Sequence, residues 1–279
     1  MQIQWYPGHM AKTKRALMES LKLVDAVIEI RDARIVKASA NPDIEKICEN
    51  KPRIILLNKC DLARDSVTDK WIKYLTSDNV RVIKTNSNNG SGLREIKPTL
   101  ELLLKDKIER MKSKGVQNFV MRVMVVGIPN VGKSSFINKM ANNKTAQTGD
   151  RPGVTKSNQW IKTKVGIELL DTPGVLWPKF EDKEVALNLA FTGAIKDEIM
   201  DIEELALNLI RKLQEDYPES LKNRYKLDEL DEDPLINMEE IAKKRGCVMR
   251  GGIDYNRVSV MILDEFRGGK LGGVSLDYL

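Results

Sequence analysis

Two short motifs stand along this chain in the reverse of their usual order. Residues 58–61 read Asn-Lys-Cys-Asp, and residues 127–134 read Gly-Ile-Pro-Asn-Val-Gly-Lys-Ser. In nucleotide-binding domains that contain both patterns, N-K-x-D comes long after the glycine-rich loop. The reversed order therefore predicts a circularly permuted domain, in which the sheet is kept and the chain termini have moved.

The glycine-rich motif lies in the context that a phosphate-binding loop requires. An apolar run, 119–126, precedes it, and a helix-compatible stretch, 135–140, follows it. Glycine lets the backbone wrap around phosphates, so the loop N–H groups and the helix N-terminus can bind the α- and β-phosphates. Lys133 is expected to reach the β- and γ-phosphates as a catalytic charge, and the Ser134 hydroxyl to bind Mg²⁺. The predicted contacts of this loop are Asn130, Val131, Gly132, Lys133, Ser134 and Ser135.

A second phosphate-side motif, Asp-Thr-Pro-Gly at 171–174, directly follows the strand-like run 167–170. Asp171 at a strand end can hold the Mg²⁺ shell through water, and the Gly174 N–H can contact a γ-phosphate, so this segment would respond to hydrolysis. Thr155 is a further candidate Mg²⁺ ligand, although a threonine placed after a proline fits a solvated loop equally well.

The N-K-x-D motif predicts which base is bound. The Asp61 carboxylate can accept hydrogen bonds from both N1–H and the exocyclic amino group of guanine, a pair that adenine does not offer. A site built for a hydrogen bond strongly rejects a ligand that lacks it, so we expect GTP rather than ATP. Asn58 would bridge the base and a neighbouring loop, and the Lys59 stem would pack on the ring. The polar turn with Asn86 and Ser87 is a candidate donor of a backbone N–H to the guanine oxygen.

Apolar runs and helical patterns alternate along the first part of the chain and predict an α/β fold. Such alternation indicates a mostly parallel sheet with helices on both faces and ligand loops at the carboxyl ends of the strands. We expect a circularly permuted P-loop GTPase domain over 1–180, with an N-terminal arm over 1–20, and a small all-α domain over 181–279. The predicted strands are 24–30, 53–57, 80–83, 119–126 and 167–170, and the clearest C-terminal helices are 185–194 and 202–213.

Motifs spread over the whole chain closely resemble those of the YlqF family of bacterial ribosome biogenesis GTPases. They are Trp5 to Met10, Asp32-Ala33-Arg34, the permuted motifs, Lys244 to Cys247, and Leu263 to Arg267. The resemblance implies a GTPase that acts late in assembly of the large (50S) ribosomal subunit, with a helical C-terminal domain that contacts rRNA. Binding in the GTP state and release on hydrolysis are part of this expectation. The chain departs from the family at Tyr6, where phenylalanine is expected, and at 273–277, where an arginine and a glutamate are expected.

The water-positioning glutamine of Ras-like enzymes has no counterpart here, because Val175 follows Gly174. We hypothesise that His9, the single histidine, positions the water; a packing or RNA-contacting role is the alternative. The resemblance suggests that Asn130 helps to hold K⁺, although an asparagine there could simply form the turn. A site without its glutamine should turn over slowly alone and depend on a partner, here the ribosomal precursor.

Charge is unevenly distributed between the two halves of the chain. Residues 1–180 contain 32 Lys and Arg against 18 Asp and Glu, whereas 181–279 contain 14 against 22. A basic excess favours an RNA partner, with a solvated lysine-rich surface as the alternative. Within the acidic half, 243–270 is basic, and we expect an RNA-facing surface there. Its apolar residues at helical spacing should leave Arg257 and Arg267 free to point outward.

Several features bear on location and on the other functional classes. No apolar run is long enough to span a bilayer, and three cysteines without C-x-x-C spacing imply neither a disulfide framework nor a zinc site. We expect a cytoplasmic monomer without a membrane partner. Two alternatives stay open: an RNA-binding scaffold that senses guanine nucleotides, and a GTPase in tRNA modification or at a membrane.

Overall fold

The central element of the fold is one mixed sheet. The computed structural model describes residues 8–141, 159–172, 174 and 182–279, without the side chains of 8–13 and 199. Within these ranges, six strands pair in the order β3-β2-β1-β4-β6-β5, and every pair is parallel except β5 with β6. The strands are β1 (Ala26–Asp32), β2 (Arg53–Asn58), β3 (Val80–Lys84), β4 (Met121–Gly127), β5 (Gln159–Lys162) and β6 (Ile167–Asp171).

The five predicted strands are confirmed, with ends shifted by at most two residues. Strand β5 was not predicted. Of its residues only Ile161 is buried, because this antiparallel strand lies at the sheet edge beside β6. A short edge strand lacks the continuous apolar run by which buried parallel strands are recognised.

Both faces of the sheet are buried by helices, and alternate residues of each strand supply the two cores. Ile28 and Ile30 of β1 pack in one cluster with α4 and α6, whereas Val27 packs in another with α1 and α2. A third cluster joins β2 to Trp71 of α3. The helices of this part are α1 (Gly8–Leu21), α2 (Pro42–Cys48), α3 (Asp65–Leu75), α4 (Ile96–Leu103), α5 (Lys105–Ser113) and α6 (Lys133–Ala141).

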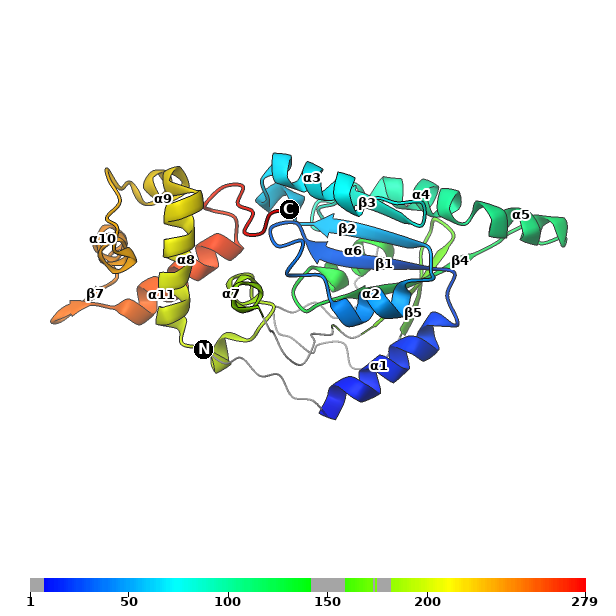
Figure 1. The fold of residues 1–279 in the computed structure, drawn as a ribbon, viewed down its shortest axis with the longest axis horizontal. Helices are drawn as coiled ribbons and strands as arrows, with labels where there is room; N and C mark the ends of the chain where they lie inside the picture. The colour runs from blue at the N-terminus through cyan, green and yellow to red at the C-terminus, as the bar shows by residue number, and fades with distance from the viewer. Residues whose placement is uncertain (1–7, 142–158, 173, 175–181) are drawn as a thin grey trace.

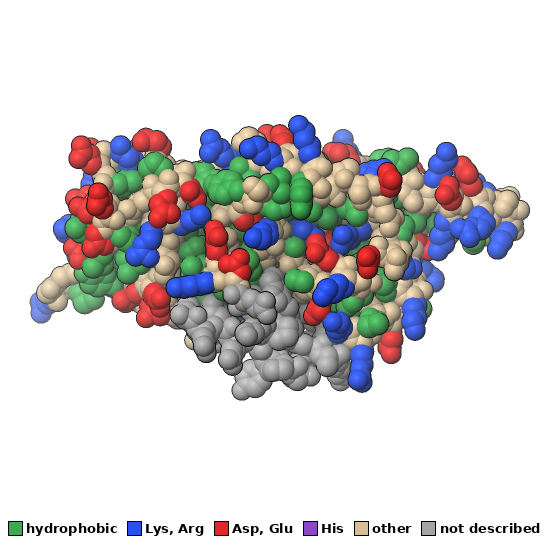
Figure 2. Space-filling view, in the orientation of Figure 1, with side chains coloured by type: hydrophobic (Ala, Val, Ile, Leu, Met, Phe, Trp, Pro, Cys, Tyr) green, Lys and Arg blue, Asp and Glu red, His purple; other side chains and the backbone are tan. Residues whose placement is uncertain are grey.

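Helices α4 and α5 form the connection from edge strand β3 back to central strand β4. This is where the chain of an unpermuted domain would have its ends. Helix α5 extends beyond the sheet and buries none of its residues (Figure 1). Its exposed lysine and arginine side chains cover this projection (Figure 2). Gly115 follows the helix in the left-handed region, at φ 84°.

The C-terminal part is helical, as predicted, with a small hairpin added. Its helices are α7 (Lys183–Phe191), α8 (Ile202–Asp216), α9 (Pro218–Tyr225), α10 (Pro234–Arg245) and α11 (Tyr255–Arg267), and the hairpin pairs β7 (Val248–Met249) with β8 (Gly252–Ile253). Side chains of Asp182, Asp201, Asp233 and Asp254 cap the first N–H groups of α7, α8, α10 and α11. Aspartate caps of this kind fix where helices begin. None of the helices in the described ranges is long and apolar enough to cross a membrane.

The last residues leave the helical part and return to the sheet. Beyond α11, Val274 donates its N–H to Leu62 O (2.9 Å) and Leu276 donates to Arg34 O (2.7 Å). The Asp277 carboxylate accepts the Ala38 N–H at 2.8 Å. We call residues 271–279 the C-terminal strap. It connects the helical part to the loops that follow β1 and β2, and Figure 1 shows it beside the carboxyl ends of these strands.

Candidate nucleotide-binding site

A cavity of about 960 Å³ lies at the carboxyl ends of the central strands. Three segments that are far apart in sequence line it: the glycine-rich loop after β4, the N-K-x-D motif after β2, and the 86–88 turn after β3. Parallel strands bring their following loops to one edge of the sheet, which is where open α/β sheets bind ligands. The helical part closes the opposite side with residues 192, 193, 195–198, 264, 267 and 268.

The glycine-rich loop has backbone geometry that depends on its last glycine. Gly132 has φ 94°, and a Cβ built on it would lie 2.3 Å from the Asn58 Nδ2 atom. Any side chain at this position would therefore displace Asn58. Directly after Gly132, α6 begins at Lys133, and its N-terminus faces the cavity as an anion site requires.

Lys133 is buried (8% exposed) and lies close enough to Asp171 for the two charges to interact. Burial lowers the pKa of Lys133, and the charge of Asp171 opposes this shift. An ammonium that has already been desolvated interacts strongly with an incoming polyphosphate, because the local dielectric is low.

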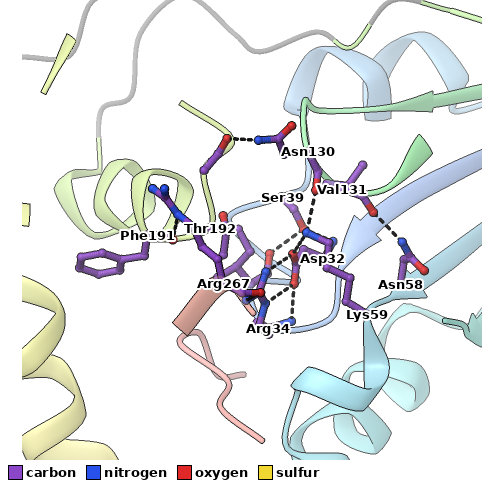
Figure 3. A network of polar contacts seen from close by, with 12 residues as sticks. Asp32, Arg34, Ser39, Asn58, Lys59, Asn130, Val131, Phe191, Thr192 and Arg267 are labelled. Atoms are coloured by element: carbon purple, nitrogen blue, oxygen red, sulfur yellow. Dashed lines mark hydrogen bonds and ion pairs between the residues drawn. The ribbon is translucent and has the colours of Figure 1, made fainter. Parts of the chain in front are cut away.

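Asn58 holds three loops together. Its Nδ2 donates to Val131 O of the glycine-rich loop (2.7 Å), and its Oδ1 accepts from the Ser87 N–H (2.9 Å) and the Ser87 hydroxyl (2.8 Å). The predicted bridge to a neighbouring loop is present, and Figure 3 shows its bond to Val131. The fourth residue of the motif, Asp61, is exposed on the cavity wall, where its carboxylate is accessible to a base.

The backbone N–H groups of the 86–88 turn are already donated within the protein. Asn86 donates to Ser91 O, Ser87 to Asn58 Oδ1, and Asn88 to Asn86 Oδ1. The contact from this turn to a guanine oxygen stays a prediction, and it requires one of these bonds to be shared or exchanged.

Two of the residues predicted to hold Mg²⁺ carry side-chain oxygens and lie at or just beyond the ends of neighbouring strands. Ser134 lies in the first turn of α6, which follows β4, and Asp171 ends β6, which pairs with β4. Hydroxyl and carboxylate oxygens suit Mg²⁺, which keeps several waters and needs only one or two protein ligands beside phosphate oxygens. The described residues contain no group of three or more His, Cys, Asp and Glu side chains that could hold a metal ion. Thr155 and the side chain of His9 lie outside the described residues.

Two cavity residues carry contacts that were not predicted. Asn130 sits in the left-handed region at φ 60° and donates its side-chain amide to Gly193 O, just beyond α7. Gly174 lies against the same loop, since a Cβ on it would be 3.2 Å from Pro129 N. The glycine-rich loop therefore contacts both the D-x-x-G glycine and the helical part.

Arg267 does not point outward, and that expectation was wrong. Its guanidinium pairs with Asp197 (2.7 Å) and donates to Phe191 O and Ala190 O, both at 3.0 Å (Figure 3). The last carbonyls of α7 have no partners within their own helix and carry partial negative charge, so they attract this cation. Arg257 is exposed, as predicted, and Val258, Ile262 and Phe266 are buried.

A buried ion pair beside the site was also not predicted from the sequence. Asp32, at the end of β1, receives two hydrogen bonds from the Arg34 guanidinium (3.0 and 2.8 Å) and lies 3.0 Å from Lys59 Nζ. Burial alone would raise the pKa of Asp32, but the charges of Arg34 and Lys59 outweigh burial and hold this pKa below its usual range. The feature of the sequence that could have indicated this ion pair was the Asp-Ala-Arg triplet at the end of a strand.

The cavity and its motifs define the class of protein: a P-loop GTPase whose domain is circularly permuted. The N-K-x-D strand β2 precedes the phosphate-loop strand β4 in the chain, yet both loops line one cavity. Comparison with known proteins then gives the family. The chain belongs to the ribosome biogenesis GTPase A family, also called the RbgA/YlqF family.

Three relatives illustrate the extent of the similarity. Ribosome biogenesis GTPase A of Bacillus licheniformis is 51% identical over 99% of this chain and 98% of its own length. Mitochondrial ribosome-associated GTPase 1 of Bos taurus is 32% identical over 98% of this chain and 88% of its own length. The GNP-bound crystal structure of YlqF from Thermotoga maritima superposes with a TM-score of 0.65 at 28% identity, covering 96% and 98% of the two chains. Residues 122–244 match the family described as 50S ribosome-binding GTPase.

Proposed function

We propose that this protein hydrolyses GTP during late maturation of the large ribosomal subunit, and that the pre-subunit stimulates the reaction. The proposal rests on the observation that the permuted motifs line one cavity. Asp61 is exposed there and available to bind guanine, and Lys133 is buried where the phosphates are expected. Membership of the ribosome biogenesis GTPase A family supplies the ribosomal context.

The proposed mechanism assigns a task to each of the residues around the phosphates. Lys133 and the N–H groups at the start of α6 neutralise the β- and γ-phosphates. Ser134, and Asp171 through water, would hold Mg²⁺, which would supply further positive charge to the transition state. Thr155 is proposed as an additional ligand in the triphosphate state, and the Gly174 N–H as the sensor of the γ-phosphate.

Two further assignments concern how hydrolysis is accelerated. His9 is proposed to orient the attacking water, because Val175 stands where Ras-like enzymes carry glutamine. K⁺ is proposed to bind beside Asn130, whose left-handed backbone places the residue in the cavity wall.

The basic surface over 243–270 is proposed to contact rRNA while GTP is bound. Lys243 and Arg250 are exposed there, and they form no ion pair among the described residues. Phosphate contacts from such side chains position a protein on RNA without reading its sequence.

The decisive experiment measures GTP turnover in KCl with and without purified large subunits, in parallel with ATP and with the His9→Ala variant. We expect slow turnover alone, stimulation by roughly 10³-fold or more with subunits, and no comparable activity on ATP. Tight GTP binding without stimulation would instead indicate a nucleotide-sensing scaffold. Unchanged stimulated turnover in a folded His9→Ala variant would reject the role of His9 alone, and equal turnover in NaCl would reject K⁺.

A further inference from the structure

A single buried carboxylate connects the base-reading lysine to the C-terminal helical part. Asp32 is 1% exposed and ends β1, which pairs in register with the end of β2 at Asn58. Its Oδ2 lies 3.0 Å from Lys59 Nζ and 2.8 Å from Arg34 Nη2, and its Oδ1 accepts from Arg34 Nε at 3.0 Å. Both cations therefore depend on one anion for their placement (Figure 3).

On one side of Asp32, the ion pair fixes where the Lys59 ammonium lies. Lys59 has a left-handed backbone at φ 57°, and its Nζ donates to Asn130 O of the glycine-rich loop at 2.7 Å. The long lysine stem has many rotamers, and holding it in one costs conformational entropy. A charge partner behind the ammonium offsets that cost before nucleotide arrives, so binding need not order the side chain.

On the other side, Arg34 holds the end of α11. Its guanidinium donates to Phe266 O at 3.3 Å and approaches Arg267 O at 3.5 Å, and it stacks on the Phe266 ring with 5.1 Å to the ring centroid. Arg34 is 1% exposed, so these contacts are made in a desolvated environment. The carbonyls at the end of α11 and the Asp32 carboxylate thus accept hydrogen bonds from the same group, the planar Arg34 guanidinium with its five donors.

We propose that Asp32 is a positioning residue for guanine-nucleotide binding, and that through Arg34 it couples the affinity for nucleotide to the docking of α11. The coupling is reciprocal: if docked α11 strengthens nucleotide binding by some factor, bound nucleotide strengthens docking by the same factor. This proposal rests on the guanine-nucleotide site proposed above. It adds the residues through which bound nucleotide affects the helical part.

A purely structural ion pair is the competing explanation, and the chain supplies a matched control. Glu29 lies on the same strand, is also 1% exposed, and pairs with Arg31 (2.6 Å) and Arg53 (3.0 Å). It does not line the nucleotide cavity. Glu29→Gln therefore breaks a comparable buried network without touching Lys59.

The test is a double-mutant comparison of GDP affinity, measured by calorimetric titration in the presence of Mg²⁺. Asp32→Asn is expected to weaken GDP binding roughly tenfold, the usual effect of losing one charge-assisted hydrogen bond. The Lys59→Met variant keeps the apolar stem and removes the charge. In this background Asp32→Asn should not weaken GDP binding further, because Asp32 acts through the Lys59 charge and the effects of interacting residues do not add. Arg34→Lys provides a second, milder perturbation and should follow the same pattern. Glu29→Gln should leave the affinity at the wild-type value.

Hydrogen exchange tests the part of the proposal that concerns α11. GDP should slow exchange of the amides at the end of α11, where Gly268 donates to Asp264 O and Gly269 to Phe266 O, and Asp32→Asn should abolish this slowing. The proposal would be overturned if Asp32→Asn lowered GDP affinity equally in the wild-type and Lys59→Met backgrounds, or if Glu29→Gln lowered it as much as Asp32→Asn does. It would also be overturned if GDP did not change the exchange of these amides in the wild type. Failure of the wild-type protein to bind GDP would instead refute the nucleotide site itself.

Discussion

Gly132 shows how strongly one residue can constrain this site. Its backbone lies in a region that favours glycine, and the space where a side chain would begin is occupied by the Asn58 amide. Because Asn58 also holds Ser87 and Val131, displacing it would disturb the base-reading loop and the phosphate loop together. The glycine is thus needed for packing as well as for its backbone conformation.

Gly132→Ala is expected to destabilise the protein by roughly 2–4 kcal/mol, from left-handed strain plus loss of the buried Asn58 bonds. GDP affinity should fall with it. Thermal unfolding and nucleotide titration measure the two effects. Gly115→Ala is the matched control: Gly115 has a similar φ of 84°, but a Cβ there meets nothing within 4 Å. Equal effects of the two substitutions would show that backbone strain alone, and not the collision with Asn58, determines the result.

At the scale of elements, the C-terminal strap joins the helical part to the permuted sheet. Tyr217 at the end of α8 accepts from the Ser275 N–H and donates to Ser275 O, at 3.0 and 2.9 Å. The segment 273–277, which lacks the family's expected arginine and glutamate, has its residues 274–277 buried against the loops after β1 and β2. Burial of these residues indicates a structural role rather than an RNA contact.

Asp277 should make the stability of the strap depend on pH. It is 7% exposed, and burial raises its pKa from 3.8 to about 7, against hydrogen bonds from the backbone of Ala38 and its neighbours. A carboxyl whose pKa is raised by folding contributes stability at low pH, and that contribution is lost as the pH rises towards 7. The free energy of unfolding of the wild type should therefore fall between about pH 4 and 7 relative to Asp277→Asn. Chemical denaturation at each pH measures the difference, and parallel pH profiles would contradict the prediction.

At the scale of the whole molecule, charge is separated between the two parts of the chain. The basic excess lies in 1–180, while the helical part is acidic except for 243–270. Under the proposed function, long-range attraction to RNA would come mainly from the sheet part, and the proposed contact in the helical part would depend on few side chains. Such an arrangement predicts which charges affect binding to the large subunit and which do not.

Replacing both Lys243 and Arg250 by glutamine should weaken binding to large subunits and flatten its salt dependence. If both side chains contact phosphates, the slope of log K against log salt should fall in magnitude by roughly 1.5–2. Sedimentation binding assays across a salt series, with a non-hydrolysable GTP analogue, provide the slope. Lys70→Gln with Lys73→Gln, two exposed charges on α3, is the control of equal charge. If this control flattens the slope as much, the surface over 243–270 has no special role.

The positions of residues in short motifs after apolar strands were predicted correctly. Buried parallel strands are continuous apolar runs, and the loops that follow them carry short motifs, so β2 and β4 and the cavity residues Lys133 and Asp61 could be recognised before the fold was known. The motif order alone was sufficient to predict the permutation, because it fixes which strands must be joined by new connections.

Only the tertiary structure decided which side chains meet across elements. Helical periodicity placed Arg267 on a polar face of α11, but packing put that face against the carbonyls at the end of α7. Asp32 and Arg34 lie together at the end of β1, whereas Lys59 follows β2, and nothing in the sequence indicates that the Asp32 carboxylate also pairs with Lys59. The sequence by itself determined the five parallel strands, the permutation and the motifs that line the cavity, because these depend on local patterns. The contacts between the site and the helical part depend on how elements pack, and sequence patterns do not contain that geometry.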